Sequence, residues 1–103
     1  MNWKQLVEVL ERLVPAGSVT TYAQVSLWGY GVPNYNQPVR SLLAGARNNG
    51  YLQLTNRVIK SNGELAELPD GQDQQRHQLL AEGVPFVADC RVDLGRVSPV
   101  ALA

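Results

Sequence analysis

Few side chains in this sequence are of the types that carry out chemistry. There is one cysteine, Cys90, and one histidine, His77, among 103 residues. Asp73 precedes His77 by four positions, but two ligands on one helix do not make a metal site, so we expect His77 to be a solvated helix residue. Cys90 has no histidine nearby in the sequence, and no glycine-flanked serine elbow is present. The sequence therefore favours a binding protein over an enzyme, with no metal and no cofactor.

The other signals of chemistry are also weak. A lone cysteine excludes an internal disulfide, and the alternating stretch Val84 to Val92 predicts a strand in which Cys90 is buried or half-buried rather than a reactive thiol. Gly29 and Gly31 lack the third glycine, the lysine and the preceding strand of a phosphate-binding loop. No apolar run approaches the roughly 20 residues of a membrane span. We expect a cytoplasmic protein without a membrane partner.

The charges are balanced overall but unevenly placed. The chain has nine basic and nine acidic side chains. From Arg12 to Gly63 there are five cations and no carboxylate, whereas Glu64 to Ala103 holds seven carboxylates and three arginines. A locally positive segment suits a polyanion. The alternative is chance clustering with internal ion pairs.

The element that must position these cations is the stretch Thr20 to Arg47. Thr21 and Gln24 have the spacing of a capping box, and Asn36 followed by Pro38 is a second helix-start signal. A loop rich in Gly, Pro and Asn separates the two starts. Two short helices joined by a turn form a helix-turn-helix, which presents one helix to a duplex.

Three side chains of this helix-turn-helix are candidates for contact with a nucleic acid. Tyr22 opens the first helix, and Arg40 and Arg47 lie seven residues apart on the second, near one face. On residues alone, the sequence predicts a small helix-turn-helix nucleic-acid binder.

The flanking helices follow from apolar periodicity. Asn2 to Leu13 has an apolar stripe at helical spacing, and Gln37 to Arg47 is expected to bury Val39, Leu42, Leu43 and Ala46. A further helix, capped by Asp70 or Gln72–Asp73, is expected to reach Glu82 with Leu79 and Leu80 inward and Gly83 past its end. At this length we expect one domain over 1–103.

The remaining segments are predicted to be extended or irregular. Tyr51 to Ile59 alternates and suggests an extended segment, and Ser61-Asn62-Gly63 is a tight-turn signal from which Glu64 to Ala66 returns as a hairpin. Pro69-Asp70-Gly71 is a further break. The last residues are expected to form a loose tail.

Several of these pieces, taken in order, resemble one protein family. They are Pro15-x-Gly17-x-Val19-x-Thr21-Tyr22-x-Gln24-Val25, a helix with Arg40 and an Arg47-x-Asn49 end, Asn56-Arg57-Val58-Ile59, Ser61-Asn62-Gly63, and Leu79 to Val84. Over about residues 2 to 85 the chain resembles the C-terminal, DNA-binding domain of O6-alkylguanine-DNA alkyltransferases. The resemblance implies a mainly α fold with a small β-hairpin, a winged-helix-like helix-turn-helix domain of that type.

The family's active-site signature, Pro-Cys-His-Arg-Val, is altered here. The matching positions read Leu54-Thr55-Asn56-Arg57-Val58, so the alkyl-accepting cysteine is Thr55 and its activating histidine is Asn56, while Glu82 matches the third member of the network. A threonine hydroxyl with no adjacent base is not a nucleophile at neutral pH. The chain looks like an alkyltransferase-like protein, a branch that binds O6-alkylguanine without repairing it and passes the lesion to nucleotide excision repair proteins.

The resemblance also implies roles for residues. Tyr22 matches the tyrosine that rotates the target phosphate, and Arg40 the arginine that fills the space of the flipped base in a minor-groove complex with double-stranded DNA. The residues expected to contact DNA are Thr21, Tyr22, Arg40, Arg47 and Arg57. Those expected to form the lesion pocket are Tyr22, Thr55, Asn56, Val58 and Ser61.

The chain departs from the family pattern on the same element. The loop from Trp28 to Tyr35 is longer and carries three aromatic residues, Leu42-Leu43 stand where glycine is common, and Glu64-Leu-Ala-Glu67 stands where some members have a lesion-reading arginine. Two alternative functions therefore remain, a protein-interaction module and a non-specific DNA binder on the same scaffold.

Overall fold

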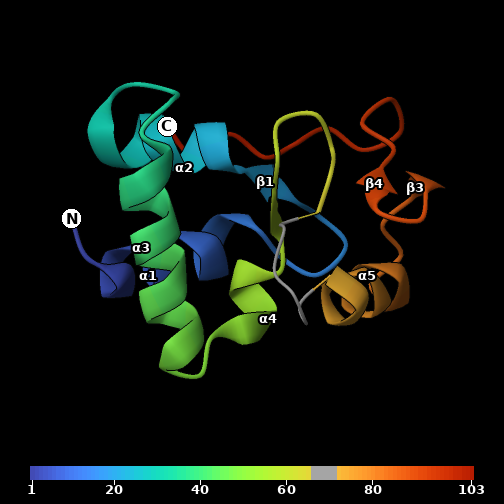
Figure 1. The fold of residues 1–103 in the computed structure, drawn as a ribbon, viewed down its shortest axis with the longest axis horizontal. Helices are drawn as coiled ribbons and strands as arrows, with labels where there is room; N and C mark the ends of the chain where they lie inside the picture. The colour runs from blue at the N-terminus through green and yellow to red at the C-terminus, as the bar shows by residue number, and fades with distance from the viewer. Residues whose placement is uncertain (66–71) are drawn as a thin grey trace.

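The computed structural model of the protein describes residues 1–65 and 72–103. The predicted break at Pro69-Asp70-Gly71, the cap at Asp70, and Ala66 and Glu67 lie outside these residues. The described part contains five helices and two pairs of short strands, and Figure 1 shows how they are arranged. The prediction of a mainly helical fold with a small hairpin is confirmed.

Helix α1 spans Trp3–Leu13, as the apolar stripe predicts. Asn2 caps it: its side chain accepts from the Gln5 backbone N–H at 3.0 Å, and the Gln5 side chain accepts from the Asn2 N–H at 3.0 Å. This reciprocal pair satisfies two N–H groups that the first turn leaves without helical partners. The helix buries Leu6, Val7, Val9 and Leu10.

The predicted helix-turn-helix is present as α2, Tyr22–Tyr30, and α3, Asn36–Asn48. The Thr21 hydroxyl accepts from the Gln24 N–H at 3.2 Å, but the Gln24 side chain accepts from the Leu102 N–H at 3.3 Å instead of completing a capping box. Asn36 is the first helical residue rather than the cap, which is Tyr35. Gly31 ends α2 with a φ of 76°, a conformation that favours glycine.

Helix α3 packs across α1, as Figure 1 shows. A Cβ on Gly45 would lie 2.9 Å from Cδ1 of Trp3, so this glycine lets the two helices approach closely. Leu42 and Leu43 face the interior, where both are buried. The core between α1, α2 and α3 contains Leu6, Val9, Leu10, Val14, Val25, Val39, Leu42, Leu43, Val58 and Leu102.

The predicted extended segment from Tyr51 to Ile59 is wrong over its first half. Leu52–Thr55 form one helical turn, α4, in which the Thr55 N–H donates to Tyr51 O at 3.1 Å and the Asn56 N–H to Leu52 O at 2.9 Å. Period-two alternation over a few residues cannot be told from a single helical turn, because so short a turn presents no repeating face. Strand β2, Val58–Ile59, follows it.

Strand β2 pairs in parallel with β1, Thr20–Thr21, in the register Thr20 to Val58. The tight turn after β2 is confirmed, since the Lys60 N–H donates to Glu64 O and the Gly63 N–H to Lys60 O, each at 2.9 Å. The predicted return after this turn is limited, within the described residues, to the bond between Lys60 and Glu64, because β2 pairs with β1 and the antiparallel strand pair lies elsewhere.

That pair is β3, Phe86–Ala88, with β4, Arg91–Val92. The single strand predicted over Val84 to Val92 is therefore two strands, and Cys90 is half-buried in the turn between them.

Helix α5, Gln72–Ala81, precedes the β3–β4 pair, and Gly83 follows it with a φ of 86°. Leu79 points inward as predicted, but Leu80 is 50% exposed. A second core contains Val19, Ile59, Leu65, Leu79, Val84 and Val92. No helix among the described residues is long and apolar enough to cross a membrane.

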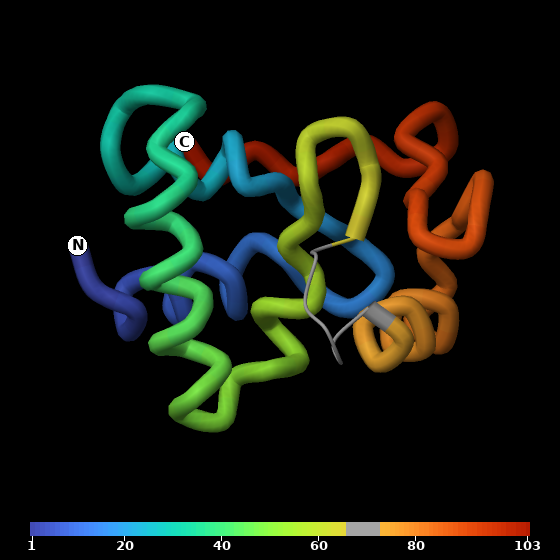
Figure 2. The backbone as a smooth tube through the Cα atoms, in the orientation of Figure 1, coloured from blue at the N-terminus to red at the C-terminus, as the bar shows by residue number. Residues whose placement is uncertain are grey.

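The C-terminal residues are docked, contrary to the predicted loose tail. The Val100 N–H donates to Val19 O at 2.8 Å, and the Thr20 hydroxyl donates to Val100 O at 2.7 Å. Leu102 is buried against α1 and α2. Figure 2 follows this segment past β1 to its end near α2. Together with the bond from the Leu102 N–H to Gln24, three hydrogen bonds and one buried leucine fix the tail to the start of the helix-turn-helix.

Candidate nucleic-acid interface

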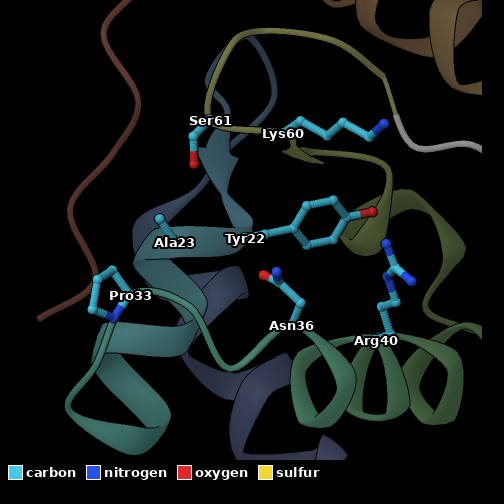
Figure 3. A pocket seen from close by; sticks show the side chains of 7 residues that line it. All are labelled: Tyr22, Ala23, Pro33, Asn36, Arg40, Lys60 and Ser61. Atoms are coloured by element: carbon cyan, nitrogen blue, oxygen red, sulfur yellow. The ribbon is translucent and has the colours of Figure 1, made fainter.

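The two halves of the helix-turn-helix face one pocket. Tyr22, the first residue of α2, and Arg40, in the first half of α3, both point into it, as Figure 3 shows. The pocket has a volume of about 210 Å³. Its described lining comes from α2, the loop before α3, α3 itself and the turn after β2, and comprises Tyr22, Ala23, Pro33, Asn36, Arg40, Lys60 and Ser61.

Tyr22 is half-buried among cations. Burial raises the pKa of its phenol above the usual value, while the charges of Arg40, Arg47 and Lys60 act to lower it. The net direction is upward, so the phenol is neutral at physiological pH and can donate a hydrogen bond. The effect of three cations on one hydroxyl places this group where an anion would be attracted.

The arginines of α3 and the Thr21 cap differ in what they present. Arg40 is exposed and Arg47 is half-buried, and the charges of both act to lower the pKa of the Tyr22 phenol. Thr21 is buried and its hydroxyl caps α2. Thr21 therefore fixes the start of α2, where Tyr22 is the first residue.

The lesion pocket expected from the resemblance divides into two places. Tyr22 and Ser61 line the pocket described above, whereas Thr55, Asn56 and Val58 are buried away from it. Val58 is only 1% exposed and belongs to the first core. The Thr55 hydroxyl donates to Leu52 O at 3.1 Å within α4.

Asn56 is held by glutamines of α5. Its side-chain amide donates to Gln78 Oε1 at 2.8 Å and to Gln74 Oε1 at 3.3 Å, and its backbone carbonyl accepts from Gln75 Nε2 at 2.9 Å. Gln78 Nε2 in turn donates to Gln53 O at 2.8 Å. This network joins α4 to α5 through groups that are all neutral amides.

Arg57 forms an ion pair in the interior. Its Nη2 lies 2.7 Å from Glu82 Oε2 and its Nε 3.1 Å from Glu82 Oε1, and Nη1 donates to Val14 O at 3.3 Å. The two side chains are 12% and 14% exposed. The guanidinium bonds to both carboxylate oxygens of Glu82, a geometry that matches its planar fork. Through Glu82 and Val14, Arg57 links the end of α5 to the end of α1.

Glu82 is held in its charged form by this pair. Burial acts to raise its pKa, but hydrogen bonds from Arg57 and Gln78, the charge of Arg57 and a backbone bond from Gly17 together hold it below the usual value. The residue beside Thr55 is an amide, which cannot act as a base. Within residues 1–65 and 72–103, no group of three metal-binding side chains lies together.

The loop before α3 is held by contacts among its own residues and with α2. The Ser26 hydroxyl donates to Val32 O and accepts from the Tyr35 N–H at 2.9 Å. Tyr30 and Tyr35 pack with ring centroids 5.6 Å apart, and Tyr35 is 51% exposed. A second hollow, of about 360 Å³, is lined by Asn34, Tyr35, Asn36, Gln37 and Pro38 and shares Asn36 with the first pocket.

Sequence reasoning missed Lys60 as a lining residue. The sequence does contain features that could have indicated Lys60, because it is a cation in the stretch without carboxylates and directly precedes Ser61. It was missed because the β1–β2 pairing, which brings this turn beside Tyr22, is non-local.

Together the fold and the pocket define a mainly helical helix-turn-helix domain with a cation-lined pocket between its two helices. No protein-family model and no curated protein matches this chain. Among solved structures, it is similar to S. pombe Atl1 in complex with damaged DNA containing O6-carboxymethylguanine, at a TM-score of 0.63 and 22% identity over 87% of this chain and 89% of that one. A second structure, S. pombe ATL in complex with DNA, has a TM-score of 0.61 and 22% identity over 88% of each chain. At this identity, the likeness shows that the chain has the fold of those proteins.

Proposed function

We propose that this protein is a non-enzymatic, alkyltransferase-like DNA-binding protein that recognises O6-alkylguanine in double-stranded DNA. The observation that carries the proposal is the convergence of Tyr22 and Arg40, from the two helices, on one cation-lined pocket. The fold likeness to Atl1, whose structures contain DNA, supports it.

The proposed mechanism is entry of α3 into the minor groove with rotation of the target nucleotide out of the stack. The neutral Tyr22 phenol donates to the phosphate of that nucleotide, and the exposed Arg40 side chain takes the place of the base. Unstacking a base costs a few kcal/mol, and a planar guanidinium replaces part of the lost stacking and pairing. Wedge insertion and arginine contacts are typical of minor-groove binding.

No alkyl transfer accompanies this binding in our proposal. Thr55 is engaged within α4, and Glu82 is paired with Arg57. The lesion stays in the DNA, so another activity must remove it, and we propose that the complex marks the site for nucleotide excision repair proteins. After incubation with alkylated DNA, we expect the intact mass of the protein to be unchanged.

Duplex titrations test the proposal. The protein is titrated with matched duplexes containing guanine or O6-methylguanine at one fixed salt concentration, because phosphate contacts make affinity salt-dependent. We expect tighter binding to the lesion duplex. Equal affinities would refute lesion recognition, and no binding to either duplex at low salt would refute DNA binding.

One observation favours a second function, a protein-interaction module. The exposed Tyr35 ring borders the hollow before α3. Absence of DNA binding together with recovery of a stable partner that depends on Tyr35 would favour this function.

A further inference from the structure

Lys60 also lines the pocket, but it has no role in the mechanism proposed above for Tyr22 and Arg40. Lys60 lies on the turn after β2, on the opposite side of the Tyr22 ring from α3. Figure 3 shows its side chain extending along one side of the ring while Arg40 approaches from the other. The phenol therefore lies between two cations that come from separate elements.

The balance of charge around the pocket is positive. Its described lining includes Arg40 and Lys60 but no carboxylate, with hydroxyl and amide groups from Tyr22, Ser61 and Asn36. Outside the lining, the Lys60 Nζ lies 4.0 Å from Glu64 Oε2. Glu64 also pairs with Arg91, at 2.9 Å from Oε1 to Nη2.

The same groups offer what an oxyanion requires. The Tyr22 and Ser61 hydroxyls and the Asn36 amide are donors, and charge-assisted hydrogen bonds from lysine and arginine are roughly twice as strong as neutral ones. At about 30 Å³ per water molecule, a pocket of about 210 Å³ has room for a phosphate or carboxylate with bridging waters.

We propose that the pocket is an oxyanion site and that Lys60 is its second cation, opposite Arg40. Lys60 would then be a further residue that contacts DNA. This inference rests on the proposed function, because DNA is the source of the anion. Two sources share the chemistry. One is a backbone phosphate, present in every duplex, and the other is the carboxylate of an acidic O6-adduct, such as carboxymethyl.

Lys60→Gln tests the proposal, because it removes the charge and keeps a polar side chain of similar length. Lys4→Gln is the matched control, since Lys4 is exposed on α1 with its Nζ 5.8 Å from the Trp3 ring centroid. Each variant is titrated with three duplexes, containing guanine, O6-methylguanine or O6-carboxymethylguanine, over a range of salt concentrations. Thermal melting checks that both variants are folded.

The expected results distinguish the two sources. For a phosphate, Lys60→Gln weakens binding to all three duplexes by about tenfold. The slope of log K against log salt then falls by about 0.9. For an adduct carboxylate, the loss is confined to the O6-carboxymethylguanine duplex. Lys60→Gln binding all three duplexes as Lys4→Gln does would overturn the proposal.

A measurement without DNA separates this inference from the proposed function. Inorganic phosphate is titrated into the wild-type protein and Lys60→Gln while the backbone amide signals of Ala23 and Ser61 are followed by NMR. We expect saturable shifts in the wild type that are weakened in the variant. A wild type that fails to bind DNA but responds to phosphate in this way refutes the proposed function alone, whereas no response to phosphate and no effect of Lys60→Gln on DNA refute the oxyanion site.

Discussion

Two neighbouring regions of this molecule use their polar side chains in opposite ways. The first is the pocket between α2 and α3, where Arg40, Asn36 and Ser61 are exposed. The second is the joint between α4 and α5, which we define as Asn56, Arg57, Gln75, Gln78 and Glu82. In the joint the polar groups bond to one another and to backbone, and no buried side-chain nitrogen or oxygen among the described residues lacks a partner.

This difference separates groups that hold the fold from groups that can meet a ligand. A buried polar network is costly unless each member is satisfied, and a satisfied network fixes the elements that carry it. Exposed cations contribute little to folding but attract an anion. The polar side chains from Asn56 to Arg57 thus serve the fold, whereas those of the pocket are exposed to a ligand.

The largest expected effect comes from breaking the joint. Glu82→Ala leaves the Arg57 guanidinium largely buried without its carboxylate, which we expect to lower the free energy of unfolding by about 3 kcal/mol. Urea denaturation measures the change, with Glu8→Ala on the exposed face of α1 as the control. DNA affinity at a temperature where the variant is folded should be unchanged. A loss no greater than that of the control would mean that the joint does not hold α5.

The second effect tests whether the docked tail supports the helix-turn-helix. Leu102→Ala removes a side chain that is 6% exposed in the first core. We expect a loss of about 2 kcal/mol, at the low end for a buried leucine because a terminal segment can relax. Leu80→Ala is the matched control, since that leucine is 50% exposed. Equal losses for the two leucines would show that the tail is not part of the folding unit.

The helices of this fold were predictable where their signals are local. The stripe of α1 and the starts of α2 and α3 depend on residues within one or two turns, which a sequence pattern records directly. The parallel pairing of Thr20 with Val58, the docking of Leu102 and the exposure of Leu80 depend on parts of the chain that meet only after folding. Local pattern therefore predicted the longer helices, but it missed the short turn α4, the division into β3 and β4, and the contacts between distant segments.

The candidate site divides along the same line. Tyr22 and Arg40 were predicted and lie on one pocket, because both belong to the helix-turn-helix. Thr55 and Asn56 were expected in the same pocket as Tyr22 by resemblance. Instead, the Thr55 hydroxyl bonds to Leu52 O within α4, and the Asn56 side chain lies in the joint. Lys60 was missed although it borders Ser61 in the sequence. Composition marked it as a cation, and only the strand pairing shows which pocket it serves.

The third effect concerns the pocket, where we expect a substitution to change DNA affinity but not stability. Arg40→Ala should weaken binding to an O6-methylguanine duplex by about 1.5 kcal/mol, slightly more than tenfold, because no side chain then compensates the unstacked base. The free energy of unfolding should not change, since Arg40 is exposed. Fluorescence anisotropy measures the affinity, with Arg12→Ala, an exposed arginine of α1, as the control. Equal affinities for the two variants would remove Arg40 from the interface.

A smaller effect is expected from the phenol. Tyr22→Phe keeps the ring in the pocket and removes one hydrogen-bond donor, which we expect to cost about 1 kcal/mol of DNA affinity. Tyr51→Phe, on an exposed tyrosine that packs against Trp3, is the control. If Tyr22→Phe binds as tightly as the wild type, the ring contributes by packing alone, and the phosphate contact proposed for its hydroxyl is wrong.

The smallest effect is the pH dependence of the joint. The pKa of Glu82 is held below its usual value because hydrogen bonds from Arg57 and Gln78 outweigh the opposing effect of burial. A carboxyl whose pKa is lower in the folded state stabilises the fold fully above the unfolded pKa, about 4.3 for glutamate, and loses that contribution as the pH falls through the folded value. Denaturation between pH 7 and pH 3 should therefore show a decline in the free energy of unfolding that is smaller in Glu82→Gln, which cannot titrate. Parallel pH profiles for the two proteins would mean that Glu82 has the same pKa in the folded and unfolded chain, and that its bonds to Arg57 do not favour its charged form.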